Sequence, residues 1–175
     1  MQIRSSLPDD LDAVLALYRR VARVPGGLAR LEPEVSREYV AGFLASAHSR
    51  GISLVAQAQD GHLLGEIHAY TPGLFCFAHV LSELTIAVDP AAQGLGLGRQ
   101  LFERFMATVR DERPDVLRVE LIARESNARA IGFYEKLGFR REGVFAGRIR
   151  NVDGSLESDI PMAWIREEAW IRKDG

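Results

Sequence analysis

Apolar positions recur every three or four residues in two stretches of the first fifty residues, which is the spacing of one helix face. The first stretch covers residues 8–21 and begins with Pro8-Asp9-Asp10, a helix start signal. The second follows Ser36, which can cap a helix, and Gly51 can close it in a left-handed conformation. The pattern therefore predicts two helices, separated by a loop at Pro25-Gly26-Gly27.

Alternating apolar positions come next and indicate strands. Two strands, at 52–58 and 63–70, flank Asp60-Gly61, a hairpin signal because both turn positions tolerate positive φ. A third strand covers residues 81–88. Alternation along it predicts that one face carries Leu84, Ile86 and Val88 and that the opposite face carries Glu83, Thr85 and Ala87.

The second half of the chain alternates helices and strands. A helix should end before Pro114, and its buried side consists of Leu101, Phe102, Phe105, Met106 and Val109. A strand at 116–123 precedes a second helix, which Asn127 can cap and Gly138 can stop. A closing hairpin pairs residues 139–149 with 156–165 through Asp153-Gly154.

The element order is therefore β-α-α-β-β-β-α-β-α-β-β, a mixed α/β arrangement without an internal repeat or an interdomain linker. The 175 residues, 47% of them hydrophobic, can bury one core of ordinary size. We expect a single domain over residues 1–175 with its core at about 2–165. The charged tail after Ile165 is expected to be partly mobile.

Charge and composition narrow the class of partner. A formal net charge of -2 gives no general attraction to nucleic acid or to membrane phosphates and favours a small neutral or cationic partner. The chain has no signal layout and no apolar run long enough to span a membrane, so we expect a cytoplasmic protein. Cys76 lies between Phe75 and Phe77, which predicts a packed thiol, and the four histidines lack the spacing of metal ligands.

Three alternating glycines follow the strand at 81–88 and precede a helix. Glycine permits positive φ and removes side chains, so successive N–H groups can point into one concavity that suits a pyrophosphate. A tight turn without a ligand is the structural alternative. A Rossmann loop would follow an early strand, and a P-loop would end in Gly-Lys-Ser or Gly-Lys-Thr, whereas this segment ends in Gly98-Arg99-Gln100.

This loop resembles that of the Gcn5-related N-acetyltransferase (GNAT) family, which reads Gln or Arg, two residues, Gly, one residue, then Gly or Ala. Gln93, Gly96 and Gly98 match it. Residues 127–139 resemble the family's asparagine-to-Gly-Phe segment, and the stretch after Gly138 is similar to branches that acetylate amino acids or protein N-termini. The resemblance implies a GNAT-like fold, with a mixed, mostly antiparallel seven-stranded sheet and about four helices.

The resemblance also implies an acetyl-CoA site. The pyrophosphate would lie on the loop amides and the pantetheine arm along the strand at 83–88, with Asn127 near that arm as well as capping its helix. A backbone N–H in a bulge of that strand would polarise the thioester carbonyl. The implied cofactor-binding residues are Ile86, Ala87, Val88, Gln93, Gly94, Leu95, Gly96, Leu97, Gly98, Arg99 and Asn127.

Acetyl transfer to an ammonium group needs a base and an acid. By resemblance, Tyr134 is the acid that protonates the leaving thiolate, with a packing tyrosine as the structural alternative. Glu83 is our candidate base, with a solvated strand carboxylate as its alternative. Glu66 and His68, which share a strand face with Tyr70, remain further candidates, as do His79 and a water chain.

The sequence thus predicts direct transfer of an acetyl group from acetyl-CoA to a primary amine of a small molecule, an amino acid or a peptide N-terminus. A non-catalytic acetyl-CoA sensor is the alternative, and a longer acyl donor stays open. The acceptor would be chosen by residues 28–44, by 71–79 and by the final hairpin. Leu74, Phe75 and Phe77 could line an acceptor pocket, form a homodimer contact or be buried under a helix.

Overall fold

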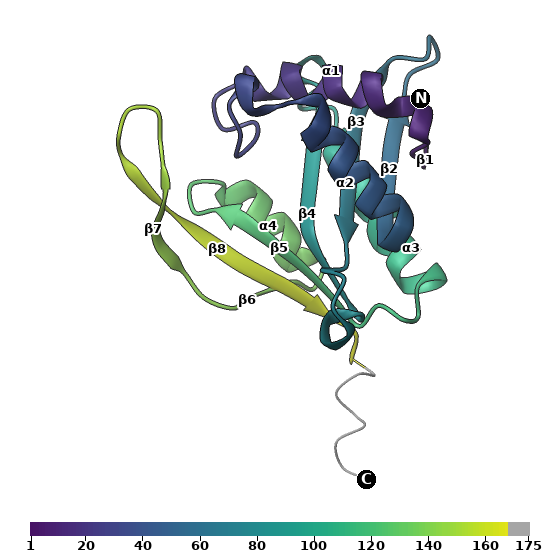
Figure 1. Cartoon of the computed structure of the whole chain (residues 1–175). Helices are drawn as coiled ribbons and strands as arrows, with labels where there is room; N and C mark the ends of the chain where they lie inside the picture. Colours follow the sequence, from purple (N-terminus) through teal and green to yellow (C-terminus); the bar gives the residue numbers. More distant parts are fainter. Residues whose placement is uncertain (168–175) are drawn as a thin grey trace. The chain divides into compact units, whose positions relative to one another are not determined.

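The computed structural model describes residues 1–167, in which four α-helices and eight strands alternate with short 3-10 turns (Figure 1). The chain groups into two compact units. The first unit comprises Met1–Thr71 and Thr85–Pro114, and the second comprises Pro72–Leu84 and the chain from Asp115 onward. Strand β4 (Val80–Val88) contributes its first half to the second unit and its second half to the first. The expectation of one domain over 1–175 stays a prediction.

The first unit contains the strands β1 (Gln2–Ser5), β2 (Gly51–Gln57) and β3 (Leu63–Tyr70), which are antiparallel neighbours, followed in the sheet by β4. The turn between β2 and β3 contains Gly61 at φ 89°, which confirms the predicted Asp60-Gly61 hairpin. The predicted strands at 52–58 and 63–70 are therefore present within one residue of their expected ends.

Helices cover both faces of this part of the sheet (Figure 1). The helices α1 (Leu11–Ala22) and α2 (Arg37–Arg50) lie on the face that carries His68, which stacks on Phe43 of α2. The helix α3 (Leu97–Glu112) lies on the other face, because a Cβ added to Gly65 would be only 2.7 Å from Leu101. Side chains of successive strand residues point to opposite faces, so both faces of β3 are buried, as its burial pattern shows.

The boundaries of α2 bear out one prediction and overturn another. The Ser36 hydroxyl accepts a hydrogen bond from the Tyr39 N–H at 3.1 Å, so Ser36 caps the helix as expected. Gly51, however, is extended at φ -155° and begins β2 instead of closing α2 in a left-handed conformation. The glycine is required for another reason: a Cβ there would lie 2.2 Å from the carbonyl oxygen of Ala69.

The second unit contains the first half of β4, the strand β5 (Arg118–Arg124) and the long strand β8 (Leu156–Ile165), together with α4 (Ala128–Lys136). β5 is parallel to β4 through only two residue pairs, Val80 with Arg118 and Leu81 with Val119. It is antiparallel to β8 through seven pairs, from Arg118 with Ile165 to Arg124 with Asp159. The sheet is thus mixed and mostly antiparallel, as predicted.

The strand predicted at 139–149 is divided, which raises the number of strands in the described residues from the expected seven to eight. Both pieces, β6 (Arg140–Arg141) and β7 (Phe145–Arg150), pair with β8. The Glu142 N–H donates to the Pro161 carbonyl at 2.9 Å, but Pro161 has no N–H with which to continue the ladder. The chain therefore leaves β8 briefly between the two pieces.

Among residues 1–167, no helix has both the length and the apolar character needed to cross a bilayer. The charged tail predicted after Ile165 falls largely outside the described residues, which end at Glu167.

Candidate active site

The glycine loop forms a turn that ends at the N-terminus of α3. The short 3-10 turn η4 (Pro90–Ala92) begins it, and Gly94 and Gly96 both have positive φ, at 79° and 78°. The Gln100 N–H donates to the Gly96 carbonyl at 3.1 Å and is the first amide bonded within the helix. The preceding amides, those of residues 97–99, therefore have no acceptor within their own helix. This is the arrangement in which backbone N–H groups bind an anion.

The first two glycines of the loop have free space where a side chain would stand. A Cβ added at Gly94 or Gly96 would meet nothing within 4 Å, so these two glycines are set by their backbone conformation and not by crowding. Gly98 differs, because its Cβ would lie 3.4 Å from Val88 and 3.9 Å from Ile86. The structure thus places Gly98 against Ile86 and Val88 at the end of β4, two segments that the sequence predicts to share the site. The residues present fit a pyrophosphate at this helix start.

Strand β4 carries a backbone irregularity at Glu83, the only residue other than glycine with positive φ in the described chain, at 56°. It lies two residues after the last β4–β5 pair, Leu81 with Val119, so the parallel pairing ends just before the strand departs from regular geometry. The resemblance placed a bulge at 86–88, whereas the left-handed residue lies three positions earlier. Positive φ at a glutamate is a strained conformation of the kind that gathers at functional sites.

This irregularity overturns the simple alternation predicted for the strand. Glu83 is exposed, whereas Ala87 is fully buried in the core that α1 and α2 form on the sheet. The two residues therefore do not share one solvent-facing side, because a left-handed residue breaks the period of two. The predicted base nevertheless lies on an accessible part of β4.

Helix α4 positions two predicted residues in the second unit. The Asn127 side chain accepts a hydrogen bond from the Ala130 N–H at 3.2 Å, which confirms it as the helix cap, and Gly138 at φ 93° confirms the predicted stop. The Tyr134 ring is half-buried 6.1 Å from the ring of Phe139. Burial raises the pKa of the Tyr134 hydroxyl, and the group carries its proton at neutral pH, as a phenol of ordinary pKa also does. Its catalytic role stays a prediction.

The remaining base candidates occupy different surroundings. Glu66 and His68 do share one face of β3, as predicted, but α1 and α2 cover that face and bury both side chains. The Glu66 carboxylate accepts hydrogen bonds from Tyr18 at 2.6 Å and from Ser53 at 2.8 Å, and His68 Nδ1 lies 3.1 Å away. His79, by contrast, is exposed. Burial therefore makes Glu66 and His68 core groups, which the strand pattern alone could not distinguish from cleft groups.

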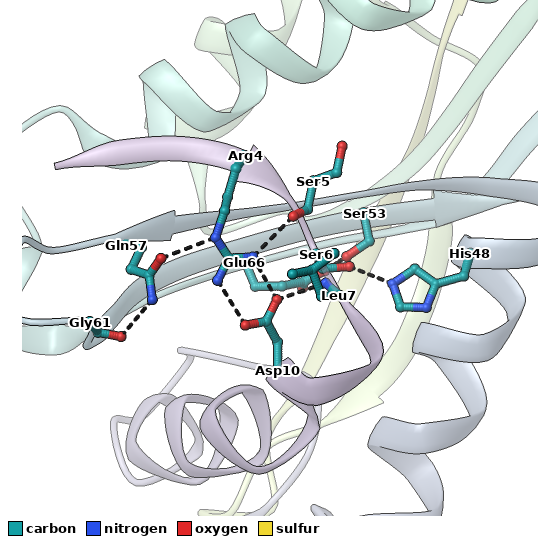
Figure 2. A network of polar contacts seen from close by, with 10 residues as sticks. All are labelled: Arg4, Ser5, Ser6, Leu7, Asp10, His48, Ser53, Gln57, Gly61 and Glu66. Atoms are coloured by element: carbon teal, nitrogen blue, oxygen red, sulfur yellow. Dashed lines mark hydrogen bonds and ion pairs between the residues drawn. The ribbon is translucent and has the colours of Figure 1, made fainter.

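A second polar network joins β1 to both helices of the same sheet face (Figure 2). Arg4 binds the Asp10 carboxylate through two hydrogen bonds of 2.7 and 2.8 Å, and Asp10 also accepts the Leu7 N–H. The Ser6 hydroxyl lies 2.7 Å from His48 Nε2. The Arg4 hydrogen bonds are the main reason why the pKa of Asp10 is lowered. No signal in the sequence identified this network, which fixes the start of α1.

Other predicted features are exposed. Arg99, which we expected near the phosphates, forms an ion pair with Glu103 at 2.8 Å along the surface of α3. Cys76 is exposed within the 3-10 turn η3 (Phe75–Phe77), so the predicted packed thiol is wrong. Leu74 and Phe77 are also exposed and Phe75 is 98% exposed, which overturns burial under a helix. Within residues 1–167, no three side chains of His, Cys, Asp or Glu are grouped to hold a metal ion.

Comparison with known proteins identifies the class that this loop and fold define. Residues 13–139 match the acetyltransferase (GNAT) family, which is most of the chain, and the chain therefore belongs to that family. Its fold matches that of a ribosomal-protein-alanine N-acetyltransferase from Brucella melitensis with a TM-score of 0.80, at 24% identity over 95% of this chain and 100% of that one. A GNAT acetyltransferase from Streptococcus pneumoniae matches with a TM-score of 0.82, at 22% identity over 94% and 99% of the two chains.

Two curated relatives are more similar in sequence over shorter stretches. The mycothiol acetyltransferase of Salinispora tropica is 40% identical over 92 residues, which are 50% of this chain and 28% of that protein. The [ribosomal protein bS18]-alanine N-acetyltransferase of Escherichia coli K12 is 41% identical over 84 residues, 46% of this chain and 55% of that protein. The matched stretches thus span about a quarter to a half of the relatives' own length.

Proposed function

We propose that this chain is a single N-acetyltransferase domain that transfers an acetyl group from acetyl-CoA directly to a primary amine. The observation that carries the proposal is the loop at the start of α3, where two left-handed glycines lead into the amides of residues 97–99, which have no acceptor within their own helix. Such a helix start binds a pyrophosphate, and membership of the GNAT family makes acetyl-CoA the ligand that fits it.

In this proposal different residues bind different parts of acetyl-CoA. The loop residues 93–99 hold the pyrophosphate, and the end of β4, Ile86, Ala87 and Val88, lies against the pantetheine arm and directs a backbone N–H at the thioester carbonyl. Asn127 contacts the same arm while it caps α4. When bound, acetyl-CoA would supply the acetyl group as a thioester, whose C–S bond breaks as the amine bonds to the carbonyl carbon, so that CoA leaves as the thiolate.

Two side chains are assigned to proton transfer. Glu83, exposed on β4, removes the proton from the ammonium group, and Tyr134 donates a proton to the leaving sulfur. The match of residues 127–139 to the family's asparagine-to-Gly-Phe segment supports the assignment of Tyr134, whose hydroxyl carries a proton at neutral pH. The burial of Glu66 and His68 argues against either as the base, while exposed His79 and a water chain remain alternatives to Glu83.

The acceptor proposed is an amine of a small molecule, an amino acid or a peptide N-terminus. One relative is named for an alanine of a ribosomal protein and another for mycothiol, so both a protein N-terminus and a small molecule are acceptors to test. Leu74, Phe75 and Phe77 are exposed, which keeps them available for an acceptor pocket or a contact with a second copy of the chain.

Calorimetry with acetyl-CoA tests the proposal, using the native protein and a Gly96→Glu variant. The variant places a negative charge at a left-handed loop position, so micromolar binding to the native protein should be lost. Gly26→Glu is the matched control, because Gly26 also has positive φ, at 75°, and its added Cβ also meets nothing within 4 Å, but it lies outside the glycine loop. No binding to the folded native protein would refute the proposal; binding without turnover of any amine would favour an acetyl-CoA sensor.

A further inference from the structure

A carboxylate stands at the start of the glycine loop, and its negative charge would repel the pyrophosphate that the loop is proposed to bind. Asp89 follows directly after β4, and its side chain is only 8% exposed. Its Oδ1 accepts the Ala91 N–H at 2.9 Å and its backbone N–H donates to the Leu64 carbonyl at 2.8 Å. Asp89 therefore shapes the loop by capping its first turn, and it places a negative charge four residues before the proposed phosphate-binding segment 93–99.

One arginine from a distant part of the sequence offsets this charge. Arg20, in the last turn of α1, donates from Nε to Asp89 Oδ2 at 2.7 Å and from Nη2 to the Leu63 carbonyl at 3.2 Å. Burial alone would raise the pKa of the Asp89 carboxyl, but the hydrogen bonds from Ala91 and Arg20 outweigh burial and hold the pKa below its ordinary range. Asp89 is thus a carboxylate whose charge is balanced within the protein.

We infer that Arg20 is a positioning residue for acetyl-CoA: it neutralises and holds the Asp89 carboxylate, so that the loop can present its amides to a pyrophosphate. The inference rests on the proposed function, since it assigns the loop to that ligand. Its physical reason is that an uncompensated carboxylate beside an anion site repels the anion, and charges in partly buried positions are weakly screened. Arg20 therefore acts on the ligand through Asp89.

The surroundings of Arg20 make it suitable for substitution. It lines a surface pocket of about 320 Å³ between α1 and the β2–β3 turn, so replacing it leaves no sealed cavity. His62 lines the same pocket, and its Nε2 lies 3.7 Å from Asp89 Oδ2. The neighbouring Arg19 carries the same charge on the same helix but donates to the Val35 carbonyl instead. Arg19→Gln is therefore a matched control for the loss of one positive charge.

The test measures the dissociation constant of acetyl-CoA by calorimetry for four proteins: native, Arg20→Gln, Arg19→Gln and the double variant Arg20→Gln/Asp89→Asn. Arg20→Gln should weaken binding about tenfold, the effect of leaving one partly buried charge unpaired. Adding Asp89→Asn removes that charge but keeps the side-chain oxygen that caps Ala91, so binding should return to within about twofold of native. The comparison of Arg20→Gln with Arg20→Gln/Asp89→Asn is then repeated with His62→Gln added to both, which removes the other basic group near Asp89.

The outcomes separate this inference from the proposed function. Native protein that does not bind acetyl-CoA overturns both. If the native protein binds acetyl-CoA and Arg20→Gln has the same dissociation constant, only the role of Arg20 is overturned. If the double variant binds as weakly as Arg20→Gln, the electrostatic explanation is overturned, because a purely structural loss would not be restored by Asp89→Asn. Should Arg20→Gln fail to fold, Arg20→Lys keeps the charge and must bind within about threefold of native.

Discussion

The hydroxyl group of Tyr18 should account for a measurable part of the free energy of unfolding. It donates to Glu66 Oε2 at 2.6 Å, and neither residue is exposed. Tyr18→Phe keeps the ring, which packs 5.1 Å from the ring of Phe43, and removes only the hydroxyl. A hydrogen bond to a buried carboxylate contributes about 1.5–3 kcal/mol, so we expect a loss of about 2 kcal/mol and a fall in Tm of roughly 4–8 °C.

Urea unfolding followed by circular dichroism measures this loss, with Tyr39→Phe as the control. Tyr39 belongs to the same aromatic cluster, 6.4 Å from Tyr18 between ring centroids, but it is only half-buried. Its change should stay within about 0.5 kcal/mol. Equal effects of the two variants would refute the reasoning. A double variant with Glu66→Gln should lose less than the two single variants together, because the two groups share one bond.

Two further predictions concern Tyr134 and Asp10. Tyr134→Phe should lower kcat about 10²-fold while the affinity for acetyl-CoA stays unchanged, because the variant loses a proton donor and keeps the ring. A thiol-release assay measures kcat, and an unaltered value would remove Tyr134 from the mechanism. The lowered pKa of Asp10, held mainly by its hydrogen bonds from Arg4, means that its stabilising effect is present above the unfolded pKa of about 3.9 and is lost as pH falls through the folded value. Asp10→Asn should therefore flatten the acid side of the stability profile below about pH 4, and an unchanged slope there would contradict the assignment.

The sequence by itself determined the local structure, because local structure depends on signals between near neighbours. Ser36 and Asn127 cap helices where their residue types predicted, and Gly61 and Gly138 adopt the positive φ that their turns require. The alternating glycines after β4 likewise identified the loop at the start of α3, because no other residue adopts that backbone so readily. Element order, fold class and family followed from these local signals.

Tertiary structure decided which side chains are buried, because burial depends on segments far apart in the chain. Glu66 and His68 looked accessible from the alternation of β3, and only the packing of α1 and α2 shows that they are core groups. Gly51 looked like a helix stop, yet the nearby Ala69 carbonyl explains the glycine. Arg20 and Asp89 are 69 positions apart in the sequence, and no short-range pattern links the end of a helix to the loop after a strand, so the sequence did not reveal their ion pair.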